Sequence, residues 1–233
     1  MRIARPIALL AGFVVALTSL SVTRSVAGDA SETLRRQVVA VVGPPGTGSC
    51  TGVILDRRRV LTAAHCLVAA AAGYRVEMIG PDGAVVSVPV ASHRRHPGFD
   101  RAALERDGNA HDVAVLTLKE ALPGDALPAR LAGPGGLSGE VFVVGMEGGF
   151  FASIANRIRV MRLAVAGGET GRMMLEPTAG GGGQPCHGDS GGPVFRKTAG
   201  GYALVAIISW GTRHCDGETA ATLVSAYHPF IRS

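Results

Sequence analysis

Short apolar runs separated by turn residues most restrict what this 233-residue chain can fold into. Most runs have roughly the four to eight residues of a strand, and glycine, proline and aspartate gather between them. The chain also has 33 glycines, which favour turns over helices. The runs are VVAVVG, TGVIL, RVLTAA, YRVEMIG, AVVSVPV and DVAVLTL in the first half, and VFVVG, NRIRVMRLAV, RMMLEP, GGPVFRK, YALVAIISWG and ATLVSAY in the second.

A segment rich in proline and glycine, residues 119–140, divides these runs into two sets. We therefore predict an all-β fold of two closed or nearly closed sheets, although periodicity alone does not separate a pair of barrels from a sandwich. The polar segment LERDGNA (104–110) predicts a loop. The tail VSAYHPFIRS (224–233) predicts a brief helix that Pro229 keeps short.

The N-terminus has the pattern of a signal peptide over residues 1–27. Arginines precede the apolar run 7–20, which is short for a membrane span, and small residues Ser25 and Ala27 suit cleavage. We expect a secreted or periplasmic mature chain, 28–233; a membrane anchor is the alternative. Cleavage would remove three arginines and no acids, lowering the formal net charge from +5 to +2. No clustered basic and aromatic surface indicates a nucleic-acid partner.

The four cysteines are Cys50, Cys66, Cys186 and Cys215. Export favours disulfides, and four cysteines allow three pairings. A zinc site is the alternative, but no C-x-x-C spacing supports it. We therefore expect no metal and no cofactor.

The segment CHGDSGGPVF (186–195) surrounds Ser190 with glycines. Glycine costs a helix interior about 1 kcal/mol relative to alanine, so this segment suits a tight bend. It is either a surface turn or a loop that carries a nucleophile. A nucleophilic serine needs a base, and the base needs an orienting group.

Two other segments offer those groups. His65 ends the strand-like run VLTAAHC, and Asp112 precedes the buried-looking run VAVLTL. A carboxylate that points inward from a strand edge needs a partner, and an imidazole is suitable. Taken alone, the histidine would be structural and the aspartate a turn or capping residue.

In combination, VLTAAHC, HDVAVLTL, CHGDSGGPVF and ISWG resemble, in this order, the trypsin/chymotrypsin-like serine endopeptidases. The resemblance covers about residues 37–233. It implies two antiparallel six-stranded β-barrels, about 28–120 and 140–233, with the active site in the cleft and a short C-terminal helix. It also implies a peptide or protein substrate, and we expect a monomer.

The resemblance assigns roles to the motif residues. His65 matches the general base, Asp112 the acid that orients it and Ser190 the nucleophile. The backbone N–H groups of Gly188 and Ser190 match the oxyanion hole. A catalytically silent binding protein of the same fold is the alternative. An α/β-hydrolase elbow is a poor match, because its order is Ser, Asp, His and a helix follows its serine.

The cysteines match two bridges of the family, Cys50–Cys66 and Cys186–Cys215, whereas its other common bridges are missing. This pattern is that of a pared-down, bacterial-type member. Thr51 and Gly52 stand where two glycines are common, and we expect little effect. His187 is expected to lie at the surface.

The resemblance also locates substrate-binding residues. Gln184 stands at the base of the primary pocket, and Ser209, Trp210 and Gly211 match the segment that pairs with substrate. Because Gln184 is uncharged and Thr219 could narrow the pocket, we predict a preference for small or medium uncharged side chains.

Many family members are activated when cleavage frees an N-terminal ammonium that pairs with the aspartate before the nucleophile, here Asp189. The usual Ile-Val-Gly-Gly start is missing. Cleavage after Arg24 would free Ser25, and signal peptidase could instead leave Gly28. Asp189 would then pair with Gly28, with an internal group or with a different N-terminus.

Overall fold

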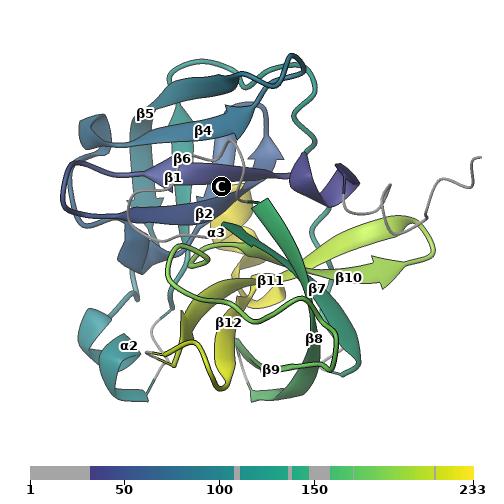
Figure 1. Cartoon of the computed structure of the whole chain (residues 1–233). Coiled ribbons are helices and arrows are strands. Elements are labelled where there is room, and N and C mark those ends of the chain that lie inside the picture. Colours follow the sequence, from purple (N-terminus) through teal and green to yellow (C-terminus); the bar gives the residue numbers. More distant parts are fainter. Residues whose placement is uncertain (1–31, 108–110, 136–137, 147–157, 170, 213) are drawn as a thin grey trace, which may run out of the picture.

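The computed structural model describes residues 32–107, 111–135, 138–146, 158–169, 171–212 and 214–233. The proposed signal peptide lies outside these residues. After a helical turn at residues 32–35, the first half of the chain forms a closed barrel in the order β1-β2-β3-β6-β5-β4 (Figure 1). Its strands are β1 (Val38–Val42), β2 (Ser49–Asp56), β3 (Arg59–Thr62), β4 (Arg75–Ile79), β5 (Val85–Arg95) and β6 (Ala114–Leu118).

The second half forms another closed barrel, in the order β10-β11-β12-β9-β8-β7. All strand pairs within both barrels are antiparallel. The predicted pair of six-stranded barrels is therefore confirmed. The strands of this second barrel are β7 (Glu140–Met146), β8 (Ile158–Glu169), β9 (Arg172–Pro177), β10 (Pro193–Thr198), β11 (Gly201–Gly211) and β12 (Thr219–Leu223).

Helical segments are short. The 3-10 helices η1 (Ala64–Cys66) and η2 (Ala71–Gly73) follow β3, and η5 (Val224–Tyr227) follows β12. The predicted C-terminal helix is confirmed as α3 (His228–Arg232), with Pro229 in its first turn, where the missing N–H of proline does no harm.

The predicted loop at 104–110 is wrong over its first residues, because α2 (Arg101–Asp107) covers them. The carboxylate of Asp100 begins this helix by accepting hydrogen bonds from the backbone N–H groups of Ala102, at 2.8 Å, and Ala103, at 3.2 Å. Ala103 anchors the helix because it is buried. The sequence reading missed this cap because Asp100 ends a turn-rich segment.

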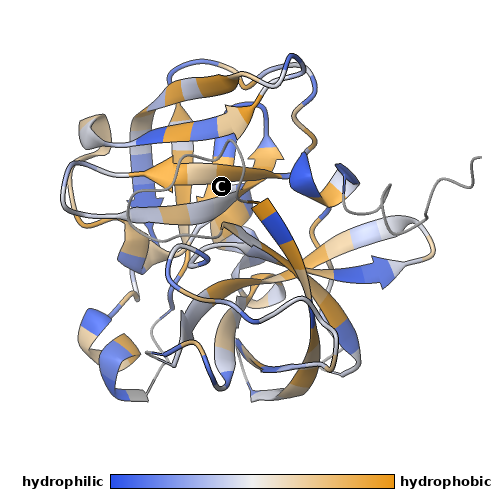
Figure 2. Ribbon diagram, in the orientation of Figure 1, coloured by the Kyte–Doolittle hydropathy of each residue, from blue (hydrophilic) through white to orange (hydrophobic). Residues whose placement is uncertain are grey.

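Strand β1 illustrates why the apolar runs are continuous. Side chains alternate across a strand. Val39 and Val41 therefore pack inside the first barrel, whereas Val38 packs in a second cluster between the barrels. That middle cluster also holds Val144 and Phe195 of the second barrel. Figure 2 shows hydrophobic residues along the strands of both barrels.

Among the described residues, no helix has the length and apolar character needed to span a bilayer.

Candidate active site

The centre of the site is a buried carboxylate bound to a histidine. Asp112, only 2% exposed, lies just before β6, and His65 lies in η1 after β3. The two residues come together because β3 pairs with β6. Asp112 Oδ2 lies 2.7 Å from His65 Nδ1, and Asp112 Oδ1 accepts the His65 backbone N–H at 2.9 Å. Because an ionised carboxylate only accepts, Nδ1 carries the proton and Nε2 keeps a free lone pair.

The second barrel adds a third donor to this carboxylate. The Ser209 hydroxyl, on β11, donates to Asp112 Oδ2 at 2.6 Å. Sequence analysis placed Ser209 in the substrate-binding segment and missed this bond, for which the local sequence offers no signal. Asp112 thus accepts three hydrogen bonds, and they link the two barrels.

Ser190 lies on the loop between β9 and β10, beside the histidine. The sulfur of Cys66 lies 3.8 Å from His65 Nε2 and 4.0 Å from the Ser190 carbonyl oxygen. The histidine ring and the serine backbone are therefore both close to this sulfur. The Ser190 hydroxyl forms no hydrogen bond with any described residue, and catalytic hydrogen bonds are often long until substrate binds. The loop turns at Gly188, with φ +97°, and Gly191, with φ +78°, which explains both glycines.

Disulfides hold the loops around these residues. Cys50 is bonded to Cys66 beside the histidine, and Cys186 to Cys215 beside the serine. Each pair also has a histidine close to its sulfurs. A disulfide sulfur is not the thiolate that binds zinc, so these two groups do not make zinc sites.

A small pocket of about 70 Å³ opens beside Ser190. A single water needs roughly 10–15 Å³ on this measure, so the pocket is small but larger than one water molecule requires. None of its described lining residues carries a carboxylate. The lining residues are Pro185, Cys186, His187, Ser190, Ile208, Trp210, Gly211, Thr212 and Cys215.

Of the predicted substrate-binding residues, Trp210 and Gly211 line this pocket, whereas Gln184 and Ser209 do not. The buried Thr219 pairs with Gly211 across the strands. A Cβ on Gly211 would lie 3.5 Å from the Thr219 hydroxyl, so Thr219 lies against the pocket wall. His187 is exposed and lies at the pocket, as expected for a surface residue.

Beneath the serine loop, the fully buried Asp189 is bound by Arg159 of β8. Arg159 Nη2 donates to Asp189 Oδ2 at 2.6 Å, and the Cys186 backbone N–H donates to the same oxygen at 2.7 Å. Burial raises the pKa of the Asp189 carboxyl, and the Arg159 guanidinium opposes that rise. Sequence analysis did not find Arg159, which belongs to none of the motifs.

Thr51 also supports the loop, contrary to the expected lack of effect. Its hydroxyl, fully buried, donates to the Gly188 carbonyl at 2.8 Å, and its backbone N–H donates to the Ser190 carbonyl at 2.8 Å. A glycine at position 51 would lack the first bond. The threonine therefore ties β2 of the first barrel to the serine loop of the second.

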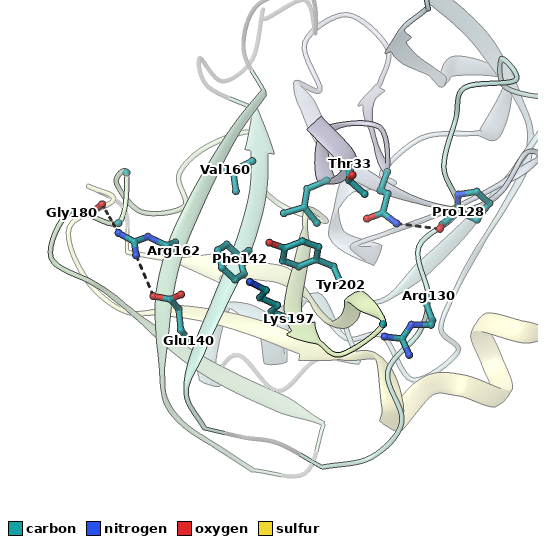
Figure 3. Close-up of a pocket in the computed structure, with 16 residues that line it drawn as sticks. Thr33, Pro128, Arg130, Glu140, Phe142, Val160, Arg162, Gly180, Lys197 and Tyr202 are labelled. Atoms are coloured by element: carbon teal, nitrogen blue, oxygen red, sulfur yellow. Dashed lines mark hydrogen bonds and ion pairs between the residues drawn. The ribbon is translucent and has the colours of Figure 1, made fainter. Parts of the chain in front are cut away.

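A much larger hollow, about 1080 Å³, lies elsewhere (Figure 3). Thr33, Pro128 and strands of the second barrel border it, and Phe142 and Tyr202 pack edge to face at 5.3 Å on its wall. Arg162 reaches across one end to Glu140 and to the Gly180 carbonyl. No predicted site residue lines this hollow. The volume of a pocket is thus a poor guide to where the chemistry takes place. The small pocket beside Ser190 is the better candidate for the substrate-binding site.

Comparison with known proteins agrees with the two-barrel fold and with a protease site. Residues 26–231 match the trypsin family. The vitellin-degrading protease of Bombyx mori is 30% identical over 189 residues, which cover 71% of this chain and 67% of that protein. Trypsin beta of Drosophila erecta is 27% identical over 180 residues, covering 71% and 70% of the two chains. These insect relatives give no support to the bacterial-type expectation.

Among solved structures, the fold is similar to that of neuropsin, a serine protease expressed in the limbic system of mouse brain. The TM-score is 0.65 at 22% identity, and the match covers 85% of this chain and 93% of neuropsin. This likeness shows the two-barrel fold.

Proposed function

The chain belongs to the trypsin family of serine endopeptidases, and from this premise we propose that it hydrolyses peptide bonds through His65, Asp112 and Ser190. The observation that carries the proposal is the buried Asp112 carboxylate bound to His65 Nδ1 at 2.7 Å. It leaves the Nε2 lone pair free on the ring that lies beside the serine loop.

The proposed chemistry is that of the serine endopeptidase family. Ser190 Oγ attacks the peptide carbonyl while His65 Nε2 takes its proton, and the same nitrogen then protonates the leaving amine. Asp112 keeps the ring in the required tautomer and stabilises the imidazolium. The acyl-enzyme that forms on Ser190 is then hydrolysed by water, which His65 activates in the same way.

Negative charge develops on the carbonyl oxygen during each attack. The backbone N–H groups of Gly188 and Ser190 are proposed to bind this oxyanion, supported by the left-handed φ of Gly188. Most side chains would disfavour that backbone conformation. Loss of one such donor typically lowers the rate by roughly 100- to 1000-fold.

We propose that the substrate residue before the scissile bond is small or medium-sized and uncharged. The small volume of the pocket supports this preference, as does the lack of a carboxylate among its described lining residues. Profiling on a peptide library tests it, and a sharp preference for arginine or lysine would contradict it. We also propose secretion, from the pattern of residues 1–27.

Fluorophosphonate labelling and peptide hydrolysis, with a Ser190→Ala control, test the assignment as a whole. We expect one adduct on Ser190 and no hydrolysis by the control. A parent protein that neither labels nor hydrolyses any library peptide would instead favour the catalytically silent binding protein.

A further inference from the structure

The turn that carries the proposed oxyanion donors is wrapped around a carboxylate. Asp189 lies between Gly188 and Ser190, and its side chain points into the protein with no exposed surface. Its Oδ2 accepts the Cys186 backbone N–H, and its own N–H donates to the Cys186 carbonyl at 3.0 Å. Its carbonyl accepts the Gly192 N–H at 2.8 Å. Backbone hydrogen bonds therefore hold the peptide planes on both sides of Asp189, and its carboxylate adds a further bond to the same turn.

A carboxylate buried in this way needs a cation, because an unpaired buried charge is strongly destabilising. Among the described residues, the cation within ion-pair distance is Arg159, at 2.6 Å. The same guanidinium nitrogen donates to the Gln184 carbonyl at 3.1 Å. Arg159 thus binds both ends of the segment 184–189, which leads into the nucleophile.

The neighbouring strands leave space for this pair. Arg159 on β8 pairs with Gly145 on β7. A Cβ at Gly145 would lie 2.0 Å from Asp189 Oδ1, so any larger residue would displace the carboxylate. The glycine and the arginine together make a fitted site for Asp189.

We propose that Arg159 is a positioning residue that holds the oxyanion loop in its working form, so that the chain becomes active without a newly cleaved N-terminus. The inference rests on the proposed function. The resemblance to the family implies that an N-terminal ammonium supplies the positive charge at this aspartate, whereas here a side chain 30 positions away in the sequence supplies it.

The first experiment leaves Arg159 intact. The mature chain starting at Gly28 is compared with the same chain carrying a short uncleavable extension before Gly28. We expect equal kcat for a peptide substrate. A large loss of kcat in the extended protein, restored by removing the extension, would overturn the proposal.

The second experiment changes the cation. Arg159→Gln is expected to lower kcat roughly 10- to 1000-fold, like loss of an oxyanion donor, with little change in KM. Arg159→Lys should restore part of the loss. The matched control is Arg162→Gln on the same strand, whose half-exposed guanidinium pairs with Glu140 at 3.6 Å and should leave kcat unchanged. Parental kcat in folded Arg159→Gln would overturn the proposal.

The alkaline side of the pH profile separates this role from activation by an N-terminal ammonium. A guanidinium stays protonated at high pH, whereas an N-terminal ammonium titrates near pH ~8. Parental kcat should therefore persist above that pH; a fall that follows the α-amino group would contradict the proposal. A parent that neither hydrolyses peptides nor labels at Ser190 overturns the proposed function and this inference together. Hydrolysis that is indifferent to Arg159 overturns the inference alone.

Discussion

Replacing Ser209 by alanine should weaken the fold by a predictable amount. The lost hydrogen bond, from the Ser209 hydroxyl to Asp112 Oδ2, is 2.6 Å long. Ser209 is 4% exposed and Asp112 2%, so solvent is largely kept from the carboxylate. A hydrogen bond to a charged group contributes about 1.5–3 kcal/mol, and a buried charge that loses a donor keeps its desolvation cost. We expect the free energy of unfolding to fall by about 2 kcal/mol.

The measurement is urea unfolding at pH 7 in the Ser190→Ala background, because an active protease would digest its own unfolded molecules. For a chain of this length, the expected loss corresponds to a decrease in Tm of about 4–8 °C. Ser87→Ala is the control, since Ser87 lies exposed on β5 and should change stability by less than about 0.5 kcal/mol. If Ser209→Ala changes stability no more than this control, the hydrogen bond contributes nothing and the reasoning is wrong.

Three further changes test other parts of the structure by the same urea measurement. Gly145→Ala should lower the free energy of unfolding by about 1–3 kcal/mol through overpacking, because its Cβ would lie 2.0 Å from a buried carboxylate oxygen. Gly167→Ala, where a Cβ would have nothing within 4 Å, should be tolerated. Equal effects of the two changes would contradict this. Removing the Cys50–Cys66 disulfide, with its 16-residue separation, should cost about 3 kcal/mol, and a loss below about 1 kcal/mol would contradict it. Burial, and then the charge of His111, lower the pKa of His96 in the folded protein. The His96 imidazole therefore binds a proton more readily in the unfolded chain, and stability falls as the pH drops below ~6.5. His96→Gln should lose less stability between pH 7 and pH 5 than the parent, and an equal loss would refute that cause.

Much of the fold could be predicted because strand signals are local. Apolar runs of strand length and the glycines between them predicted two sets of strands, and the resemblance to the trypsin/chymotrypsin-like family predicted that each set closes into a six-stranded barrel. The helix α2 was missed because its start depends on one capping carboxylate, that of Asp100, in a segment that otherwise reads as turns. Propensity alone does not distinguish a short polar helix from a polar loop.

The residues of the candidate site were likewise predicted only in part. Motifs pointed to His65, Asp112 and Ser190, and the structure brings the first two into contact and the third beside them. Arg159 belongs to no motif, and Thr51 stands at a family position where glycine is common. Their roles were not predicted because their partners lie 30 and 137 positions away in the sequence. Such long-range contacts leave no mark on a single sequence.

The candidate site is built from both barrels, so its geometry depends on how the two barrels pack against each other. The imidazole of His65 and the carboxylate of Asp112 come from one barrel, the proposed nucleophile Ser190 and the Ser209 hydroxyl come from the other, and an apolar cluster joins the two barrels. Neither half holds a complete set of reacting groups. On the proposed mechanism, a displacement of about 1 Å between the two barrels would lower the rate by roughly 100-fold even while each barrel stays folded.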